Sequence, residues 1–408
     1  MNEEAAVIAM TLSADQLPGI GETDCRPMVV MSYGMGVDST AILLRWLIEP
    51  ASRDFDLKDL VVVTAHTGDE FEQTLRDVEA VVLPEIRKNC VRFVQVGRSQ
   101  RKTTASGHGV EVLDDSNAPQ RLHVTGYKLS DEMLSAGTLP QIGGTRICSI
   151  HAKANCLEPV IAAITAGRPY RHVLGFEAGE RSRAAKDALF NTEQRVGWYP
   201  LIEWNWDRNR CGEFIAAATD RQWAKSACSY CVFAMTTRVG QQKVIERYRR
   251  EPQAAARALF LEAVARSLNE RQTLIAGGSV ADLVGQANLT DARARYEAML
   301  EECEHAIYEV RRITRRSSKP TQGRGITARS VRAVARGERQ QMHHELARFP
   351  GLRQVGADGI VRHHIRQRGT EFPALEHFYV VCPAVVDDKQ RPGFDSWWQE
   401  ATTDDVLF

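Results

Sequence analysis

Apolar and polar positions follow two different periods over the first half of the chain. Residues 39–48 and 70–89 place apolar side chains at helical spacing. Short apolar runs rich in β-branched residues are typical of buried strands, and they cover residues 28–32, 59–67, 91–97 and 171–177. Strands of this kind, separated by helices, predict a doubly wound α/β fold in which helices cover both faces of a mostly parallel sheet.

The pattern changes along the chain and divides it into four regions. We expect an N-terminal tail at 1–26, an α/β domain at 27–240, a helical region at 241–318, and a basic C-terminal region with a small α+β unit at 319–408. Residues 100–140 are polar and punctuated by glycine, which predicts an insertion or a lid within the α/β domain. The α/β domain is thus expected to precede a helical, basic C-terminal region.

Composition narrows the classes of protein. The chain has 408 residues and a hydrophobic content of 43%, which is typical of a globular protein. Because its formal net charge is zero, a nucleic acid could bind only to a local patch of positive charge. The N-terminus is acidic where a signal peptide would be basic, and no apolar run is long enough to cross a bilayer. These features predict a cytoplasmic protein with no membrane partner, whose nine cysteines are reduced.

The turn "SYGMGVDST" joins the first strand to the first helix. It places a helix N-terminus at the carboxyl edge of the sheet, where backbone N–H groups and the helix dipole attract an anion. Gly34 and Gly36 allow the backbone to approach such an anion closely, and Asp38 is expected to cap the helix. The turn lacks the Gly-Lys-Ser/Thr of a Walker A loop, and Ser39 replaces the third glycine of the dinucleotide fingerprint. A purely structural turn is the alternative.

The second strand ends in a similar way. In "TAHTGDEFEQT", the run Thr67, Gly68, Asp69 and Glu70 follows the strand and starts a helix. Because the two strand ends meet at one edge of a parallel sheet, we expect them to frame a nucleotide.

Five stretches in one order resemble the motifs of a known family. "SYGMGVDST" is similar to the pyrophosphate loop of the PP-loop ATP pyrophosphatases. "TAHTGDEFEQT" resembles the stretch that follows this loop in the phosphoadenosine-phosphosulfate (PAPS) reductase branch. "TRICSIHAK", "VLGFEAGERSR" and "WYPLIEWNW" resemble later segments of the same branch, so the likeness covers about residues 28–235.

This resemblance implies an adenine nucleotide alpha hydrolase-like fold that binds ATP with Mg²⁺. Such enzymes adenylylate a substrate oxygen, release pyrophosphate and, in some members, transfer sulfur from a donor protein. DNA phosphorothioation-type sulfurtransferases are closest in character. Carried onto this chain, the resemblance gives Lys153, Arg181 and Arg183 the role of stabilising anionic oxygens while the adenylyl group is transferred. It assigns the phosphates and nucleotide to Ser32, Gly34, Gly36, Asp38, Ser39, Thr40, Thr67 and Gly68.

Two positions depart from the family pattern. Tyr33 replaces the first loop glycine, so the backbone there is less permissive. His66 stands where the family has an aspartate, and a neutral imidazole cannot carry the same charge. A hydrogen-bonded polar residue at a strand end is the alternative role for His66.

The cysteines predict a metal centre. Cys228 and Cys231 form a C-x-x-C pair, a spacing that suits one metal or cluster. The resemblance adds Cys148 and implies a [4Fe–4S] cluster, with zinc on the same ligands as the alternative. Cys156 is the candidate fourth ligand, although on one continuous helix it would stand roughly 12 Å from Cys148. Cys211 is the other candidate, and purely structural cysteines remain an alternative.

Arginine is concentrated in residues 311–339 of an otherwise neutral chain. Such a segment suits phosphate contact, so DNA or tRNA is a predicted partner, while a solvated helix face is the alternative.

Two other functions stay open. A sulfonucleotide reductase would bind PAPS or its unphosphorylated relative in the same cleft, but the C-terminus lacks the Cys-Gly-x-His setting of its nucleophile, and Cys382 lies in an apolar run. A nucleotide-binding protein without enzymatic activity is the third possibility.

Overall fold

The computed structural model describes residues 17, 19–20, 28–104, 106–140, 147–316 and 325–403. The chain forms two compact units: the first holds residues 1–130 and 143–229, and the second holds 131–142 and 230–408. Almost all of the expected N-terminal tail, and the boundary expected at 318/319, lie outside the described residues.

The first unit is built on a six-stranded sheet in the order β4-β3-β2-β1-β5-β6. Its strands are β1 (Val29–Ser32), β2 (Leu60–Ala65), β3 (Arg92–Arg98), β4 (Val110–Ser116), β5 (Tyr170–Val173) and β6 (Arg195–Trp198). All neighbouring pairs are parallel except β3 with β4, which is antiparallel. The predicted α/β fold with a mostly parallel sheet is confirmed.

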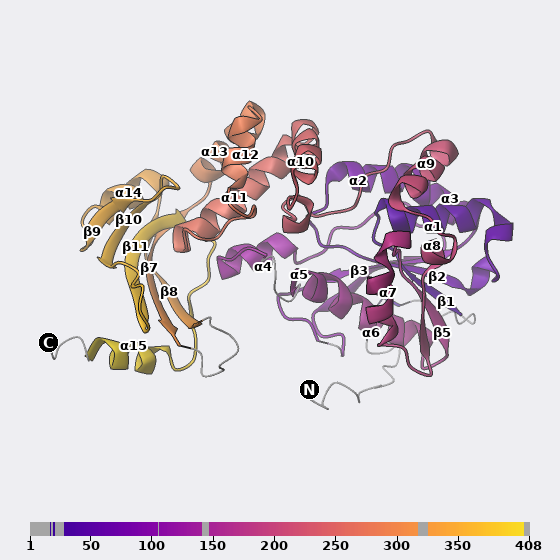
Figure 1. Ribbon diagram of the computed structural model, residues 1–408, viewed down its shortest axis with the longest axis horizontal. Coiled ribbons are helices and arrows are strands. Elements are labelled where there is room, and N and C mark those ends of the chain that lie inside the picture. The colour runs from indigo at the N-terminus through magenta and orange to yellow at the C-terminus, as the bar shows by residue number, and fades with distance from the viewer. Residues whose placement is uncertain are drawn as a thin grey trace. The chain divides into compact units, whose positions relative to one another are not determined.

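Helices cover both faces of this sheet, which explains why its central strands β1 and β2 are almost wholly apolar. Val29 and Met31 of β1 belong to the core shared with α1, whereas Val30 belongs to the core shared with α6 (Figure 1). The helices of this unit are α1 (Val37–Ile48), α2 (Glu72–Asp77), α3 (Leu83–Lys88), α5 (Ile147–Ser149), α6 (Asn155–Thr165), α7 (Arg181–Ala188), α8 (Pro200–Glu203) and α9 (Arg208–Thr219). Two five-residue π-helical turns, Val78–Val82 and Ile150–Ala154, join α2 to α3 and α5 to α6.

The order of the parallel strands reverses at β1. From β1 the chain builds outward through β2 to β3, and then returns to place β5 and β6 on the other side of β1. At such a reversal the connections leave β1 and β5 toward opposite faces, so a crevice opens at the carboxyl ends of these two strands. The turn "SYGMGVDST" follows β1 at this edge.

The second unit combines helices with a second sheet. Its helices are most of α4 (Leu129–Ala136), and α10 (Arg238–Arg250), α11 (Pro252–Leu268), α12 (Val280–Gln286), α13 (Thr290–Glu302), α14 (Arg339–Leu346) and α15 (Phe394–Thr403). Its strands are β7 (His305–Arg315), β8 (Ile326–Gly337), β9 (Leu352–Val355), β10 (Val361–Arg366), β11 (Ala374–Pro383) and β12 (Lys389–Gln390).

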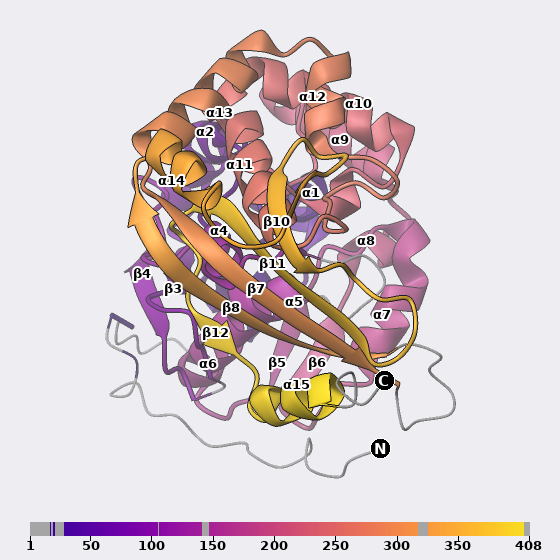
Figure 2. The ribbon, with the colours of Figure 1, turned by 90° about the vertical axis from the view of Figure 1, so that its left-hand side faces the viewer.

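These strands form an antiparallel sheet in the order β12-β8-β7-β11-β10-β9. The prediction of a helical C-terminal region is therefore wrong from His305 onward. One face of the sheet packs on α11, through Tyr308 and Phe378 against Phe260. The opposite face is covered by α14 near one end and by α15 near the other (Figure 2).

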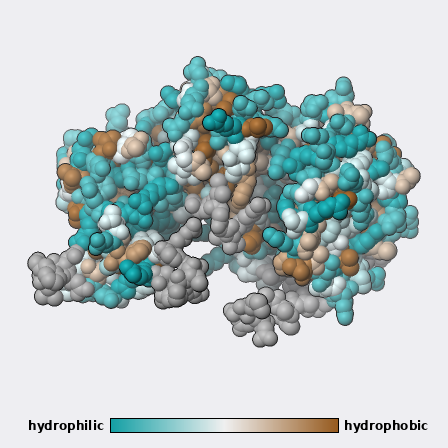
Figure 3. All heavy atoms as spheres, in the orientation of Figure 1, coloured by the Kyte–Doolittle hydropathy of each residue, from teal (hydrophilic) through white to brown (hydrophobic). Residues whose placement is uncertain are grey.

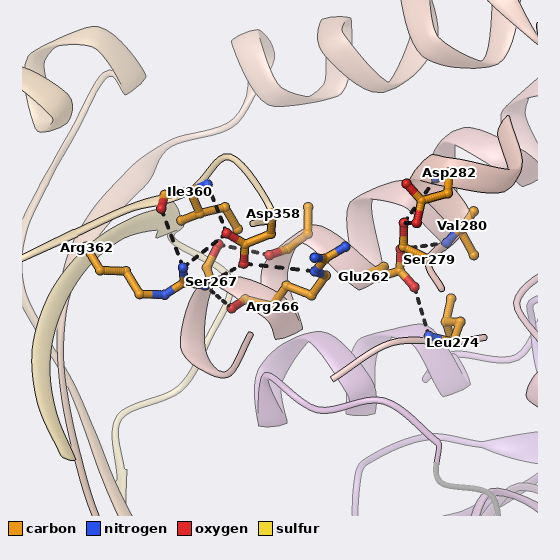
Figure 4. A network of polar contacts seen from close by, with 11 residues as sticks. Glu262, Arg266, Ser267, Leu274, Ser279, Val280, Asp282, Asp358, Ile360 and Arg362 are labelled. Carbon is orange, nitrogen blue, oxygen red and sulfur yellow. Dashed lines mark hydrogen bonds and ion pairs between the residues drawn. The ribbon is translucent and has the colours of Figure 1, made fainter. Parts of the chain in front are cut away.

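Buried acidic side chains fix the loops of the second unit (Figure 4). Glu262 of α11 is 2% exposed and accepts hydrogen bonds from the backbone N–H groups of Leu274 and Val280, each at 2.8 Å. Asp358 accepts from the Arg362 guanidinium at 2.7 Å. Because a buried carboxylate is costly unless donors surround it, these contacts explain why both acids are tolerated in the interior.

The face in Figure 3 is mostly hydrophilic, with apolar residues scattered over it. None of the helices in the described part of the chain is long and apolar enough to cross a membrane.

Candidate functional site

The turn between β1 and α1 is an uncapped helix start. Gly36 is the N-cap residue of α1, and no side chain there accepts a hydrogen bond from the first turn. The expectation that Asp38 caps the helix is wrong, because Asp38 lies inside the first turn. Met35 has φ 59°, and the Trp223 indole N–H donates to its carbonyl at 3.2 Å. The backbone is thereby held in shape while the N–H groups at the helix start face the carboxyl edge.

The glycines of this turn differ in the space around them. A Cβ built on Gly34 would have no heavy atom of the described structure within 4 Å. On Gly36 it would lie 2.8 Å from Ser226 Oγ. On Gly175, which follows β5, it would lie 3.0 Å from the backbone nitrogen of Ser39. The end of β5 thus touches the start of α1, and the open space lies beside Gly34.

Asp38 is paired with Arg208, a residue that the sequence did not single out. The Arg208 Nε–H contacts both carboxylate oxygens at 3.1 Å, and its Nη2 donates to one of them at 2.8 Å. Burial raises the pKa of Asp38 above its ordinary value, and the bidentate contact with Arg208 opposes that effect. Arg208 begins α9, whose N-cap is Asp207. The sequence signals the start of α9, because Asp207 precedes a helical run. It gives no sign that Arg208 pairs with Asp38, which lies 170 residues away in the chain.

Tyr33 does not narrow the open side of the turn. Its ring is 2% exposed, lies edge-on to Phe93 in the core, and its hydroxyl shares a hydrogen bond of 3.0 Å with Thr40. Burial raises the pKa of Tyr33, so it stays neutral. The Thr40 hydroxyl is therefore committed to the core, while Ser39 Oγ donates to the Gly36 carbonyl at 3.2 Å.

The end of β2 anchors a neighbouring loop. The Thr67 backbone N–H and hydroxyl donate to Glu70 Oε1 at 2.8 and 2.7 Å. Gly68 has φ +79°, and a Cβ there would lie 2.6 Å from Lys128 Cγ. Asp69 is fully buried and accepts from both the backbone N–H and the hydroxyl of Ser130, at 2.7 and 2.9 Å. Thr67 and Gly68 reach the predicted edge, where they also fix the chain before α4.

His66 is a buried, neutral residue at the same edge. Its Nε2 lies 3.0 Å from Gln95 Oε1, and burial lowers its pKa. Lys153, an exposed residue of the turn before α6, lies near enough to lower that pKa further. The hydrogen bond matches the alternative of a satisfied polar residue.

Arg181 and Arg183 lie at the start of α7, beyond β5, and both are exposed. Arg183 donates to Glu180 Oε1 at 2.6 Å and stacks over Phe176, with its guanidinium carbon 4.5 Å from the ring centre. Ser32 ends β1, and its hydroxyl lies 2.8 Å from His172 Nε2 on β5.

The predicted metal ligands do not share one environment. Cys156 is fully buried in the core on the α6 face of the sheet, and burial raises its pKa to about 11. Cys211 is fully buried in the core on the α1 face, and burial raises its pKa to about 12. Because the sheet lies between these cores, one metal cannot take both. Cys148, Cys228 and Cys231 are all partly buried and form no disulfide.

Within the described ranges, no group of three or more histidine, cysteine or acidic side chains could hold a metal ion. The side chains present thus do not form a ready cage for a cluster, and no chemical step is assigned to one.

The arginine-rich segment 311–339 forms the β7–β8 hairpin, apart from residues 317–324, which lie outside the described ranges. Its arginines are largely paired within the second unit. Arg312 is 4% exposed and contacts Glu376, and its Nη2 donates to the Leu268 carbonyl at 2.8 Å. Arg332 donates to Glu309 at 2.9 Å but keeps 65% of its side chain exposed. The segment is therefore not a helix face, and most of its charge is already matched.

Comparison of the chain with protein-family models, with curated proteins and with solved structures finds no match.

Proposed function

We propose that the first unit binds an adenine nucleotide at the carboxyl edge of its sheet, as an adenine nucleotide alpha hydrolase-like domain would. The protein is then an ATP pyrophosphatase-type enzyme that adenylylates a substrate and releases pyrophosphate. One observation carries this proposal: at the reversal of strand order, α1 starts without a side-chain cap beside a glycine that faces open space. A helix N-terminus of this kind offers N–H groups and a positive dipole end to a phosphate.

The residues of the site suit the charge that develops in such a reaction. As the bond between the α- and β-phosphates breaks, negative charge grows on the leaving pyrophosphate, and fixed N–H groups at Gly36 and beyond stabilise it without reorganising. Lys153 is exposed and free to approach these oxygens, and Arg181 and Arg183 extend from the neighbouring strand end. When bound with the nucleotide, Mg²⁺ would share the phosphate charge with these groups.

Sulfur transfer to a nucleic acid, with an iron–sulfur cluster or zinc on Cys148, Cys228 and Cys231, is the further part of this proposal. Reconstitution under anaerobic conditions and iron counting test it: Cys148→Ser should lose metal that Cys90→Ser retains, because Cys90 is exposed outside the predicted set. For a DNA or tRNA substrate, Arg332 and Arg336 of the hairpin keep 65% and 49% of their side chains exposed to meet phosphate.

The reductase alternative receives less support. Cys382, the cysteine nearest the C-terminus, is 1% exposed in β11, and burial raises its pKa to about 12. A thiol in that state supplies almost no thiolate to attack sulfur.

Calorimetry with MgATP and a pyrophosphate-release assay test the proposed function. We expect binding, and slow conversion of ATP to AMP and pyrophosphate that a nucleic-acid substrate accelerates. A folded chain that takes up neither ATP nor an adenosine sulfonucleotide would refute it.

A further inference from the structure

Four polar side chains form a continuous chain of hydrogen bonds across the first sheet. Ser32 Oγ lies 2.8 Å from His172 Nε2, and the Nε–H of Arg195 donates to His172 Nδ1 at 2.9 Å. The Nη2 of Arg195 in turn contacts both carboxylate oxygens of Asp187, at 2.9 and 2.8 Å. The chain thus runs from the end of β1 through β5 and β6 to α7.

Arg195 fixes which nitrogen of His172 carries the proton. A guanidinium can only donate hydrogen bonds, so Nδ1, which faces it, must present its lone pair. The ring proton then resides on Nε2, and Nε2–H donates to Ser32 Oγ. Burial, followed by the charge of Arg195, lowers the pKa of His172 to about 4, so the ring stays neutral at physiological pH.

Arg195 is itself held firmly. Besides the contacts with Arg195, Asp187 accepts the hydroxyl proton of Tyr199 at 2.7 Å. Asn191 Oδ1 accepts from Arg195 Nη1 at 3.3 Å and from the Gly197 backbone N–H at 2.8 Å. The guanidinium therefore cannot turn away from His172 without breaking several hydrogen bonds.

This arrangement rules out a familiar interpretation of a serine beside a histidine. A general base must accept the serine proton through a free nitrogen lone pair. In this chain the lone pair of His172 faces Arg195, and the nitrogen next to Ser32 is a donor. Ser32 is thus not activated as a nucleophile, and its oxygen already receives one hydrogen bond.

The register of the strands shows from which side His172 reaches Ser32. His172 is level with Val30, two residues before Ser32 on β1, so its hydrogen bond reaches Ser32 from the interior side. That contact occupies the interior side of the oxygen, so the hydroxyl proton is able to turn toward the carboxyl edge. In the part of the chain that the structure describes, no side chain or backbone carbonyl accepts it.

We propose that His172 is the positioning residue that keeps Ser32, which the family resemblance already assigns to the phosphates, as a hydrogen-bond donor to a phosphate oxygen of the bound nucleotide. The inference rests on the proposed function. It also defines a preference: because the Nε2–H of His172 already occupies one lone pair of Ser32 Oγ, the hydroxyl is biased toward donating, which suits an unprotonated phosphate oxygen.

Nitrogen NMR of the imidazole rings tests the tautomer without any nucleotide. The His172 signals are assigned by their loss in His172→Gln. We expect Nε2 protonated and Nδ1 bare, with no titration between pH 5.5 and 8. A ring protonated on Nδ1, or one that titrates near its ordinary value, would overturn the inference.

Binding of MgATP, and of pyrophosphate alone, tests the role of the hydroxyl. We expect Ser32→Ala and His172→Leu each to weaken binding about tenfold or more, as the loss of a hydrogen bond to a charged group does. The double variant should be scarcely weaker than Ser32→Ala, because His172 acts through the serine. His172→Gln keeps an N–H near the position of Nε2 and should restore much of the affinity, while His108→Gln, at an exposed histidine, serves as the matched control.

The outcomes separate the two proposals. If the wild-type chain binds neither MgATP nor pyrophosphate, the proposed function and the role of Ser32 both fall. If the wild type binds and Ser32→Ala binds equally well, or the two substitutions weaken binding independently, only the role of Ser32 and His172 is overturned. Circular dichroism of each variant confirms that it folds, and His172→Gln provides the test should His172→Leu not fold.

Discussion

Replacement of Gly34 by alanine separates the stability of the turn from its function. The added methyl group would meet no heavy atom of the described structure within 4 Å, and the φ of Gly34 is not in the left-handed region. The folded state should therefore accept alanine without strain. Because alanine also restricts the unfolded chain, we expect the free energy of unfolding to rise by about 0.4–1 kcal/mol.

The same methyl group should harm nucleotide binding. If a phosphate lies against the backbone of the turn, the methyl occupies the space that the phosphate needs, and overpacking of this kind costs about 1–3 kcal/mol. That corresponds to a loss of affinity of roughly five- to 150-fold. Chemical denaturation measures the stability, and calorimetry with MgATP measures the affinity.

Two other glycines serve as controls. Gly212 of α9 also has no heavy atom within 4 Å of a built Cβ, so Gly212→Ala should stabilise by about 1 kcal/mol through helix propensity and leave affinity unchanged. Gly175→Ala would press on the backbone of Ser39 at 3.0 Å and should destabilise by about 1–3 kcal/mol. If Gly34→Ala bound MgATP as tightly as the wild type, the phosphates would not lie at this turn, and the reasoning would fail.

Three further predictions concern other parts of the chain. Arg312→Leu leaves Glu376 buried without its partner and should cost about 3–5 kcal/mol in denaturation experiments, whereas Arg332→Leu should cost less than about 1 kcal/mol. The folded-state pKa of His172, about 4, is below its ordinary 6.5, so its contribution to stability is present above pH 6.5 and lost toward pH 4. Between those limits wild-type stability should fall by about 3 kcal/mol relative to His172→Gln, measured by denaturation across pH. A thiol reagent should modify exposed Cys90 quickly and Cys211 only on unfolding, as mass spectrometry of the labelled chain would show.

The sequence was sufficient for the four inner strands of the first sheet because each contains apolar residues that the sheet buries. The runs at 28–32, 59–67, 91–97 and 171–177 match β1, β2, β3 and β5 closely. The edge strands β4 and β6 were missed, since both are only partly buried and carry polar residues. Edge strands need less apolar sequence, so they give a weaker signal.

Strand β7 of the second sheet, which falls in the region expected to be helical, was missed for a different reason. In β7, residues Ala306, Tyr308 and Val310 alternate toward α11, which is the period of a strand. The arginines that follow them resemble a charged run, and Arg312 itself points into the core, where Glu376 neutralises it. The charge pattern therefore concealed the strand, because a sequence alone does not show that an arginine has a buried partner.

The candidate site was predictable in its backbone but not in its side-chain partners. Glycines and hydroxyls after a strand mark the turn locally. The pairs Asp38–Arg208 and Ser32–His172 join residues 170 and 140 positions apart, and only the return of the chain beside β1 brings them together. Spacing rules describe contacts within one element, so neither pair had a signal in the sequence beyond a polar residue near the end of a buried strand.

These pairings also bear on the proposed anion site, because the carboxyl edge is rich in acidic residues. Asp38 is matched by Arg208, Asp69 accepts two hydrogen bonds from Ser130, and Glu70 accepts two from the threonine three residues before it. A carboxylate surrounded by donors repels a phosphate far less than a bare one, so these three acids weaken the attraction of the α1 N–H groups and dipole for an anion less than their charges alone would. The same donors occupy the oxygens that would bind a divalent cation. We therefore expect Mg²⁺ to arrive with the nucleotide, held by its phosphates and by water, so that metal without nucleotide should bind the first unit only weakly.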